Sequence, residues 1–182
     1  MVTTEKSAIL NINREKLYEI NRDHLEKFSK YIEGVKSVDL ISKEENNNKY
    51  NIHRKWDISD KLPDMISYVL PEGTLDTILI YDDIAVWDND NFTSEYTITP
   101  SGSLKLYKIT GKTFFEKLDD DKCKIVLKLD LQLDLSSIPI SSLLLEPLRN
   151  TISNIFIEKI SNSMYETTKK LTEVLETNDN II

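Results

Sequence analysis

The sequence predicts an α+β protein in which a curved antiparallel sheet is covered by one long C-terminal helix. The strand signal is clearest over residues 123–135, where every odd position is apolar and most even positions are polar or charged. Because side chains alternate between the faces of a strand, this segment has one apolar face. After Pro147, apolar residues recur at steps of three and four, the period of an α-helix. The simplest arrangement buries these two long apolar faces against each other.

The N-terminal part of the chain predicts a strand followed by short helices. Residues 4–12 alternate weakly and indicate a first strand. Asn13 is a suitable N-cap for one or two helices over residues 14–33, with a break expected at Asn21–Asp23. Gly34 follows as a C-cap residue.

The middle of the chain then changes to a period of two and predicts an antiparallel meander. We expect strands at 35–43, 49–58, 75–87, 92–98, 104–115 and 123–135, with polar turns at 44–48, 88–91 and 119–121. Residues 59–73 contain two prolines and predict a loop with a short helix over 63–69. Six successive strands with short connections form a meander, and strands of this length must bend and twist. A bent sheet around a straight helix leaves space between the two.

Length and charge favour one acidic domain. We expect a single domain over residues 1–182, with its core at 4–176 and a tail at 177–182. The net charge of −8 argues against a nucleic-acid partner and against more than transient contact with anionic membranes. The first residues lack the apolar run of a signal peptide, and no window approaches a membrane span. We therefore expect a cytoplasmic protein.

The order and lengths of these elements resemble the START-like, or helix-grip, superfamily, also called SRPBCC. The resemblance extends over residues 4–176. Local similarity is greatest to a bacterial branch to which no catalytic residues are assigned, and it rests on Trp56-Asp57-Ile58, Leu62-Pro63, Tyr68-Val69-Leu70, the strand ending at Trp87, and the final strand–Pro–helix segment. The superfamily includes steroidogenic-acute-regulatory lipid-transfer domains, birch-pollen-type plant proteins and polyketide cyclases. The resemblance implies a hydrophobic cavity between sheet and C-terminal helix that holds a lipid, sterol or polyketide.

Arg54 is the most informative single residue, because it lies on the apolar face of its predicted strand between Ile52 and Trp56. A charged group at such a position needs a partner. One hypothesis is that Arg54 points into the cavity and pairs with a carboxylate or phosphate of a ligand. The alternative is that it lies near the strand end or pairs with an internal carboxylate such as Asp82 or Asp83.

A set of apolar and aromatic residues is predicted to line the cavity together with Arg54. Core packing alone could explain any one of these residues. If the sheet and the helix do not pack tightly along their whole length, however, a pocket remains between them and these residues line it. The hydroxyl groups of Tyr50 and Tyr96 could orient the polar end of a ligand. The predicted ligand-binding residues are Tyr50, Arg54, Trp56, Trp87, Phe92, Tyr96, Leu129, Leu131, Ile152, Phe156 and Met164.

No motif predicts a metal, a cofactor or a catalytic residue. Two histidines and a single cysteine, Cys123, do not form a zinc site, and Cys123 falls on the apolar face of its strand. The Asp88-x-Asp90 pair lacks the glycine and glutamate of a calcium loop. Phosphate-binding glycine motifs and the nucleophile motif of hydrolases are absent.

Three functions therefore stay open. We favour a non-enzymatic carrier of a hydrophobic small molecule, with Ser59–Gly73 as the lid through which the ligand exchanges. The second is an enzyme of cyclase, aromatase or hydrolase type in the same cavity; its candidate titratable groups are Arg54, Asp82, Asp83, Tyr96 and Tyr107, and a buried carboxylate with a raised pKa beside open space would favour it. The third is a protein-interaction module without a ligand.

Overall fold

The computed structural model describes residues 2–32, 34–59, 79–103, 105–136 and 142–177, and for residues 142–148, 156, 171, 176 and 177 it describes the backbone only. These residues form one seven-stranded antiparallel sheet in the order β1-β7-β6-β5-β4-β3-β2. The strands are β1 (Val2–Leu10), β2 (Val35–Asn46), β3 (Lys49–Ile58), β4 (Ile80–Asp88), β5 (Thr93–Pro100), β6 (Tyr107–Lys117) and β7 (Cys123–Leu133). The helices are α1 (Arg14–Asp23), α2 (Leu25–Phe28) and α5 (Ser142–Thr177). The predicted α+β fold is confirmed.

Strand β7 shows why the sheet has one buried face. Its odd-numbered residues from Cys123 to Leu131 are all buried. Along β1, by contrast, exposed and half-buried residues alternate, as expected for the edge of a sheet. The antiparallel register joins Val2 to Leu131 and Leu10 to Cys123, so the N-terminal strand closes the side of the meander that lies next to the last strand.

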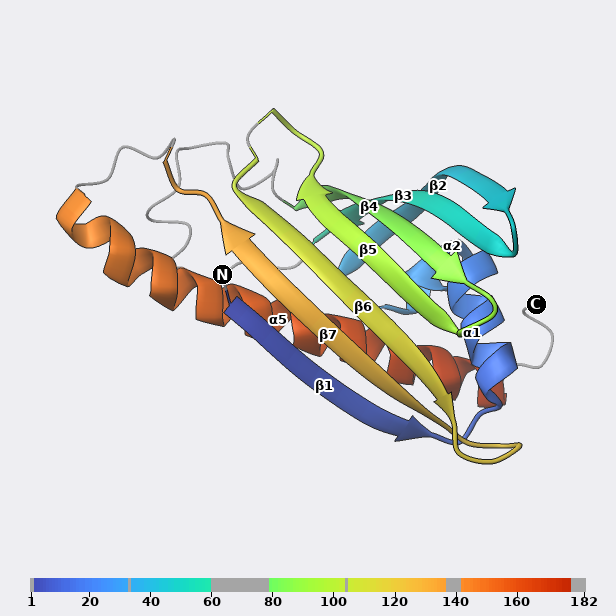
Figure 1. Ribbon diagram of the computed structural model, residues 1–182. Coiled ribbons are helices and arrows are strands. Elements are labelled where there is room, and N and C mark those ends of the chain that lie inside the picture. The colour runs from blue at the N-terminus through green and yellow to red at the C-terminus, as the bar shows by residue number, and fades with distance from the viewer. Residues whose placement is uncertain (1, 33, 60–78, 104, 137–141, 178–182) are drawn as a thin grey trace.

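Helix α5 lies along one face of the curved sheet and packs mainly against β1 and β7, while α1 and α2 lie at one end (Figure 1). The helix begins at Ser142, so Pro147 lies in its second turn. The helix therefore starts earlier than the helical period after Pro147 indicated. The apolar period and the position of the proline do not show where the helix starts, because Leu143–Leu145, which precede the proline, are themselves good helix formers.

The short helices follow the capping chemistry that the sequence indicates. The side chain of Asn13 accepts a hydrogen bond of 3.0 Å from the Lys16 backbone N–H, as an N-cap does. The break between the helices lies at His24 and not at Asn21–Asp23. Asn21 stays helical because its side-chain amide donates to the Leu17 carbonyl inside the same helix.

Two predicted turns differ from the expectation, the first in its length and the second in its position. Strand β2 continues to Asn46, and the hairpin to β3 needs only Asn47 and Asn48, whose φ angles are 48° and 61°. Two consecutive left-handed residues form the turn that suits the twist of a hairpin, and asparagine tolerates this conformation. Phe92 is also left-handed, with φ of 51°, and belongs to the turn before β5 rather than to that strand.

Several predictions fall on residues 60–78, outside the described part of the chain. These are the helix at 63–69, most of the lid at Ser59–Gly73 and the first residues of the strand at 75–87. The described part of that strand, β4, begins at Ile80. The tail at 177–182 is described only at Thr177.

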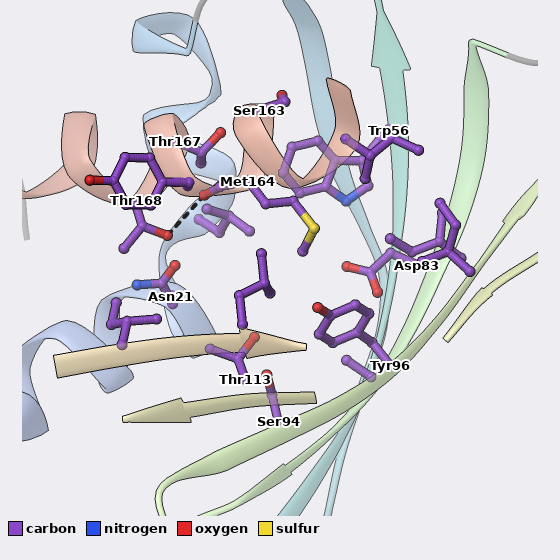
Figure 2. Close-up of a pocket in the computed structure, with 18 of the residues that line it drawn as sticks. Asn21, Trp56, Asp83, Ser94, Tyr96, Thr113, Ser163, Met164, Thr167 and Thr168 are labelled. Atoms are coloured by element: carbon purple, nitrogen blue, oxygen red, sulfur yellow. Dashed lines mark hydrogen bonds between the residues drawn. The ribbon is translucent and has the colours of Figure 1, made fainter. Parts of the chain in front are cut away.

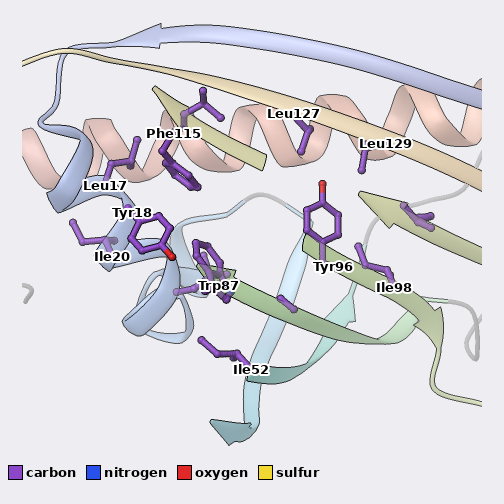
Figure 3. Close-up of a cluster of buried hydrophobic side chains, with 14 of the residues drawn as sticks. Leu17, Tyr18, Ile20, Ile52, Trp87, Tyr96, Ile98, Phe115, Leu127 and Leu129 are labelled. Carbon is purple, nitrogen blue, oxygen red and sulfur yellow. The ribbon is translucent and has the colours of Figure 1, made fainter. Parts of the chain in front are cut away.

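The hydrophobic core lies between the sheet and the helices and has an aromatic cluster at the end near α1 (Figure 3). The ring of Tyr18 meets Trp87, Phe92 and Phe115 edge to face at centroid distances of 5.1–5.3 Å. Such pairs add specific contact energy to the burial of the rings. Towards the middle of the sheet the packing is less complete, and a cavity opens there.

Candidate functional site

A cavity of about 200 Å³ lies between the concave face of the sheet and α5 (Figure 2). Each of the seven strands contributes to its wall, as do α1, α2 and α5. Most of the wall is apolar and comes from inward-facing positions of the strands. The aliphatic and aromatic part includes Ile98, Ile109, Phe115, Ile125, Leu127 and Met164. An apolar molecule in this space would bind through burial alone, at about 0.8 kcal/mol for each CH₂ group removed from water.

Asp83 is the carboxyl group at the centre of this wall. It lies on β4 directly opposite Arg54 of β3, and its side chain points toward Tyr96 and Met164 in the cavity (Figure 2). Its Oδ1 is buried and has no hydrogen-bond partner among the described residues. Burial raises the pKa of Asp83 to about 6, although the charge of Arg54 and the indole N–H of Trp56 act in the opposite direction.

Three N–H and O–H groups around the same space make no hydrogen bond of good geometry in the described part of the chain: the indole N–H groups of Trp56 and Trp87 and the hydroxyl of Tyr96. The Trp56 N–H still lies close enough to Asp83 to lower its pKa, and the Tyr96 hydroxyl lies close to Thr113 in the same way. Burial raises the pKa of Tyr96, so its hydroxyl remains protonated and can donate. The Trp56 ring is held by stacking on Tyr81 at a centroid distance of 5.8 Å. A buried polar group without a partner costs about 1–3 kcal/mol, which a ligand with matching groups would recover.

Gly111 lets Tyr96 reach the cavity. The two residues face each other across β5 and β6, and a Cβ atom at position 111 would lie 2.5 Å from the Tyr96 ring. The ring therefore lies over bare backbone, and its hydroxyl points into the space that Asp83 faces (Figure 2).

Arg54 is buried and lies at the edge of the cavity, but its guanidinium is held by groups of the protein. Its Nε donates to Glu26 Oε1 at 2.5 Å, and its Nη2 donates to the Arg22 carbonyl at 2.6 Å. The carboxylate that pairs with Arg54 is therefore Glu26 and not Asp82 or Asp83, which were the expected internal partners. Asp82 points to the outer face, where its Oδ1 is 2.8 Å from His53 Nε2. A role of Arg54 toward a ligand acid stays a prediction.

The structure brings five of the residues predicted to bind a ligand together around the cavity: Arg54, Trp56, Trp87, Tyr96 and Met164. Leu129, Leu131 and Ile152 are buried core residues that do not line it. Tyr50 instead packs under the Arg22 guanidinium at 4.5 Å. Phe92 packs under Arg14 at 3.7 Å, because its left-handed backbone takes it off the strand face. The side chain of Phe156 is outside the described set.

The set of predicted ligand-binding residues lacked several polar residues of the wall. Asp83 was considered as a partner of Arg54 and as a catalytic candidate but not as a ligand-binding residue, although it shares the alternation of Tyr81, Ala85 and Trp87 and so faces the same side. That period-two signal was sufficient to place it. No comparable signal pointed to Asn21, Ser94, Thr113, Ser163 or Thr168, whose positions depend on how the helices cross the sheet.

A second, more polar groove of about 630 Å³ runs between α5 and the segment from Tyr31 to Gly34. It shares Lys159, Ser163 and Thr167 with the cavity, so these three residues of one helix face separate the two spaces. Among the described residues, no cluster of histidine, cysteine or acidic side chains could hold a metal ion. No described helix has the length and apolar character needed to cross a bilayer.

Sequence comparisons gave no match to a family model or to a curated protein. Solved structures are similar in fold. An aromatase/cyclase, Zhui from Streptomyces sp. R1128, has a TM-score of 0.63 at 10% identity, covering 96% of this chain and 94% of that one. Norcoclaurine synthase from Thalictrum flavum, in complex with dopamine and hydroxybenzaldehyde, has a TM-score of 0.61 at 11% identity, with coverage of 97% and 88%. A START superfamily protein from Mycobacterium smegmatis has a TM-score of 0.52 at 11% identity, with coverage of 93% and 98%.

These likenesses confirm the START-like, helix-grip fold. They also correct one expectation. We favoured a carrier without catalytic activity, but two of these three structures are enzymes, so the fold gives no reason to set catalysis aside. The preference had rested on the absence of catalytic motifs, and such motifs need not exist where one buried carboxyl group can do the chemistry.

Proposed function

We propose that this START-like protein binds a compact hydrophobic molecule in the cavity, with a polar group of that molecule at Asp83, Tyr96 and Trp56. The observation that carries the proposal is the set of unpartnered buried polar atoms facing an otherwise apolar space. Buried polar groups in proteins almost always have partners, and an exception inside a cavity is typical of a binding site.

The size of the cavity limits the ligand. A volume of about 200 Å³ is somewhat larger than the ~150 Å³ cavity that holds benzene in a protein core. One aromatic ring with a short chain fits this space, whereas a sterol would need the adjoining groove or a different position of the wall. We therefore expect phenylalkyl or similarly compact compounds to bind better than long lipids.

Tryptophan fluorescence tests this proposal directly, because the chain has two tryptophans and both Trp56 and Trp87 line the cavity. Titration with phenylbutanol, which barely absorbs where tryptophan is excited, is expected to give a saturable change in emission.

Two neighbouring substitutions on β4 form the control. Ala85→Leu fills the cavity and should abolish the response, while Val86→Leu places the same side chain at the neighbouring position on the exposed outer face and should preserve it. Melting curves establish that both variants are folded. A response that does not saturate, or that is equal in both variants, would sink the proposal.

A second candidate function is acid–base catalysis by Asp83, which a carboxyl group with a pKa of about 6 beside open cavity space favours. Such a carboxylate could take a proton from carbon next to a ketone, while the Tyr96 hydroxyl or the Trp56 N–H donates to the enolate oxygen. The C–H bond breaks, the proton moves to Asp83, and return of a proton restores the ketone. In D₂O this exchange places deuterium on the ligand.

The exchange can be measured by NMR with phenylbutanone. We expect the wild-type protein and the outer-face variant Asp82→Asn to accelerate deuterium uptake, with half-maximal rate near pH 6, and Asp83→Asn to give the uncatalysed rate. Equal uptake with wild-type protein and Asp83→Asn would exclude this function for Asp83.

A further inference from the structure

The charged groups of the cavity wall differ in whether a partner already holds them. Arg54 is bound to Glu26 and to a backbone carbonyl, which leaves its charge compensated. Lys6 donates to Asn162 of α5. Lys159 and Lys169 line the cavity from α5. Asp83 remains as the acidic side chain of the cavity wall that has a buried oxygen without a partner among the described residues.

Of the cationic side chains that line the cavity in the described part of the chain, only Arg54 acts on the pKa of Asp83. Arg54 and His53 are the charged groups that act on it, and His53 projects to the other face of β3, where it meets Asp82. The groups that act on the pKa of Asp83 are Arg54, Trp56 and His53. The other ionisable groups around the cavity are Glu26, which binds Arg54, and the lining residues Lys6, Tyr81, Tyr96, Tyr107, Lys159, Tyr165 and Lys169. The tyrosines are neutral, because burial raises the pKa of Tyr81, Tyr96 and Tyr107.

We propose that the cavity selects its ligand by charge: it accepts hydrophobic amines best, takes neutral alcohols less well, and rejects hydrophobic carboxylates of the same shape. The proposal rests on the proposed ligand-binding function and names the class of molecule for that site. An ammonium group placed at Asp83 Oδ1 would form a charge-assisted hydrogen bond in a water-poor space. A carboxylate there would meet a like charge and would lose its hydration without compensation.

Three compounds that share a phenylbutyl group distinguish the effect of ligand charge from the effect of ligand shape. Phenylbutanol, phenylbutylamine and phenylbutanoate carry a neutral, a cationic and an anionic end, and their own charges are nearly constant between about pH 6 and about pH 8. Each is titrated against the full chain by tryptophan emission. We expect the amine to bind at least about tenfold more tightly than the alcohol at about pH 7.5, and the carboxylate to bind more weakly than the alcohol.

Acidification should remove most of the amine's advantage over the alcohol. Between about pH 7.5 and about pH 5 the Asp83 carboxylate takes up a proton, so its ionised fraction falls about tenfold and amine affinity falls with it. Alcohol affinity should change little. Asp83→Asn should remove both the preference for the amine and its pH dependence.

Two control variants isolate Asp83. Asp82→Asn removes a carboxylate at the adjacent, outward-facing position and should leave the preference intact. Histidine is the other residue type that changes charge in this pH range, so His53→Gln should also retain it.

The outcomes separate this inference from the function on which it rests. If the alcohol binds but the amine binds no better, or if Asp83→Asn keeps the preference, selection by Asp83 is wrong while ligand binding stands. Carboxylate binding that exceeds alcohol binding would also contradict it and would point to the α5 lysines. If none of the three compounds alters the emission, the proposed function fails as well.

Discussion

At the scale of single residues, Asp83 and Arg54 show opposite ways of burying a charge. Arg54 has two protein acceptors within 2.6 Å, whereas Asp83 has an oxygen without a partner in the described part of the chain. A fully paired buried ion supports the fold, and an incompletely paired one reduces stability while leaving a reactive group. This contrast predicts opposite effects of their substitution on stability.

Replacement of Asp83 by asparagine should stabilise the protein at neutral pH. The carboxyl pKa is about 6 in the folded protein against an ordinary value of 3.8, which corresponds to about 3 kcal/mol. Below about pH 4 both folded and unfolded chains are protonated and the penalty is absent; it grows as pH rises and is complete above about pH 6. We therefore expect Asp83→Asn to raise the melting temperature at pH 8 and to change it least at pH 4. A gain of equal size at both pH values would contradict the assignment.

Replacement of Arg54 by methionine should destabilise the protein by about 3 kcal/mol or more, because Glu26 and the Arg22 carbonyl lose a buried partner. Urea unfolding measures this as a lower midpoint at unchanged slope. The exposed pair Lys112–Glu95 provides the control: Lys112→Met should cost less than about 1 kcal/mol. Similar losses in both variants would show that the Arg54 pair is not the buried contact described.

At the scale of elements, the sequence predicted strands better than turns or helix ends. Alternation placed β3, β6 and β7 almost correctly, because a half-buried strand must alternate. The β2–β3 turn was predicted too long, since five polar residues resemble a loop even when three of them continue an exposed edge strand. The start of α5 was missed because its first turn precedes Pro147. The pairing of Tyr96 with Gly111 depends on register, which the sequence did not specify.

Gly111→Ala tests that pairing. The added methyl group would meet the Tyr96 ring, so the ring must move and β5 and β6 must separate locally. We expect a loss of about 1–3 kcal/mol in urea unfolding and weaker phenylbutanol binding. Thr110→Ala, a position on the opposite face of the same strand, should have a smaller effect on both. If Gly111→Ala binds phenylbutanol normally, Tyr96 is not part of the site.

At the scale of the whole molecule, the fold could be predicted because two long apolar faces had to meet. The binding site could be predicted only in part. Glu26 and Arg54 are 28 residues apart, and their contact depends on how α2 sits against β3, which no local pattern encodes. Likewise, the sequence indicated a cavity between sheet and helix, but it did not indicate that the incompletely paired charged group in its wall would be the acidic Asp83 rather than the basic Arg54.

The arrangement also predicts that ligand binding increases the stability of the folded protein. A molecule held between the sheet and α5 binds the folded chain alone and should raise the melting temperature with its concentration. At a hundred times the dissociation constant, phenylbutylamine should add about 2.7 kcal/mol to the free energy of unfolding. Calorimetry of the wild-type protein and of Ala85→Leu measures this, and stabilisation of both to the same extent would place the ligand elsewhere.

The central claim is that a hydrophobic molecule occupies the space between sheet and α5 with its polar end at Asp83. A crystal structure of the protein with phenylbutylamine tests it most directly. We expect the phenyl ring among Ile98, Ile109 and Leu127, and the amine nitrogen within hydrogen-bond distance of Asp83 Oδ1. A ligand found in the groove beside Tyr31, on the outer face of the sheet, or with its amine directed away from Asp83 would contradict the account.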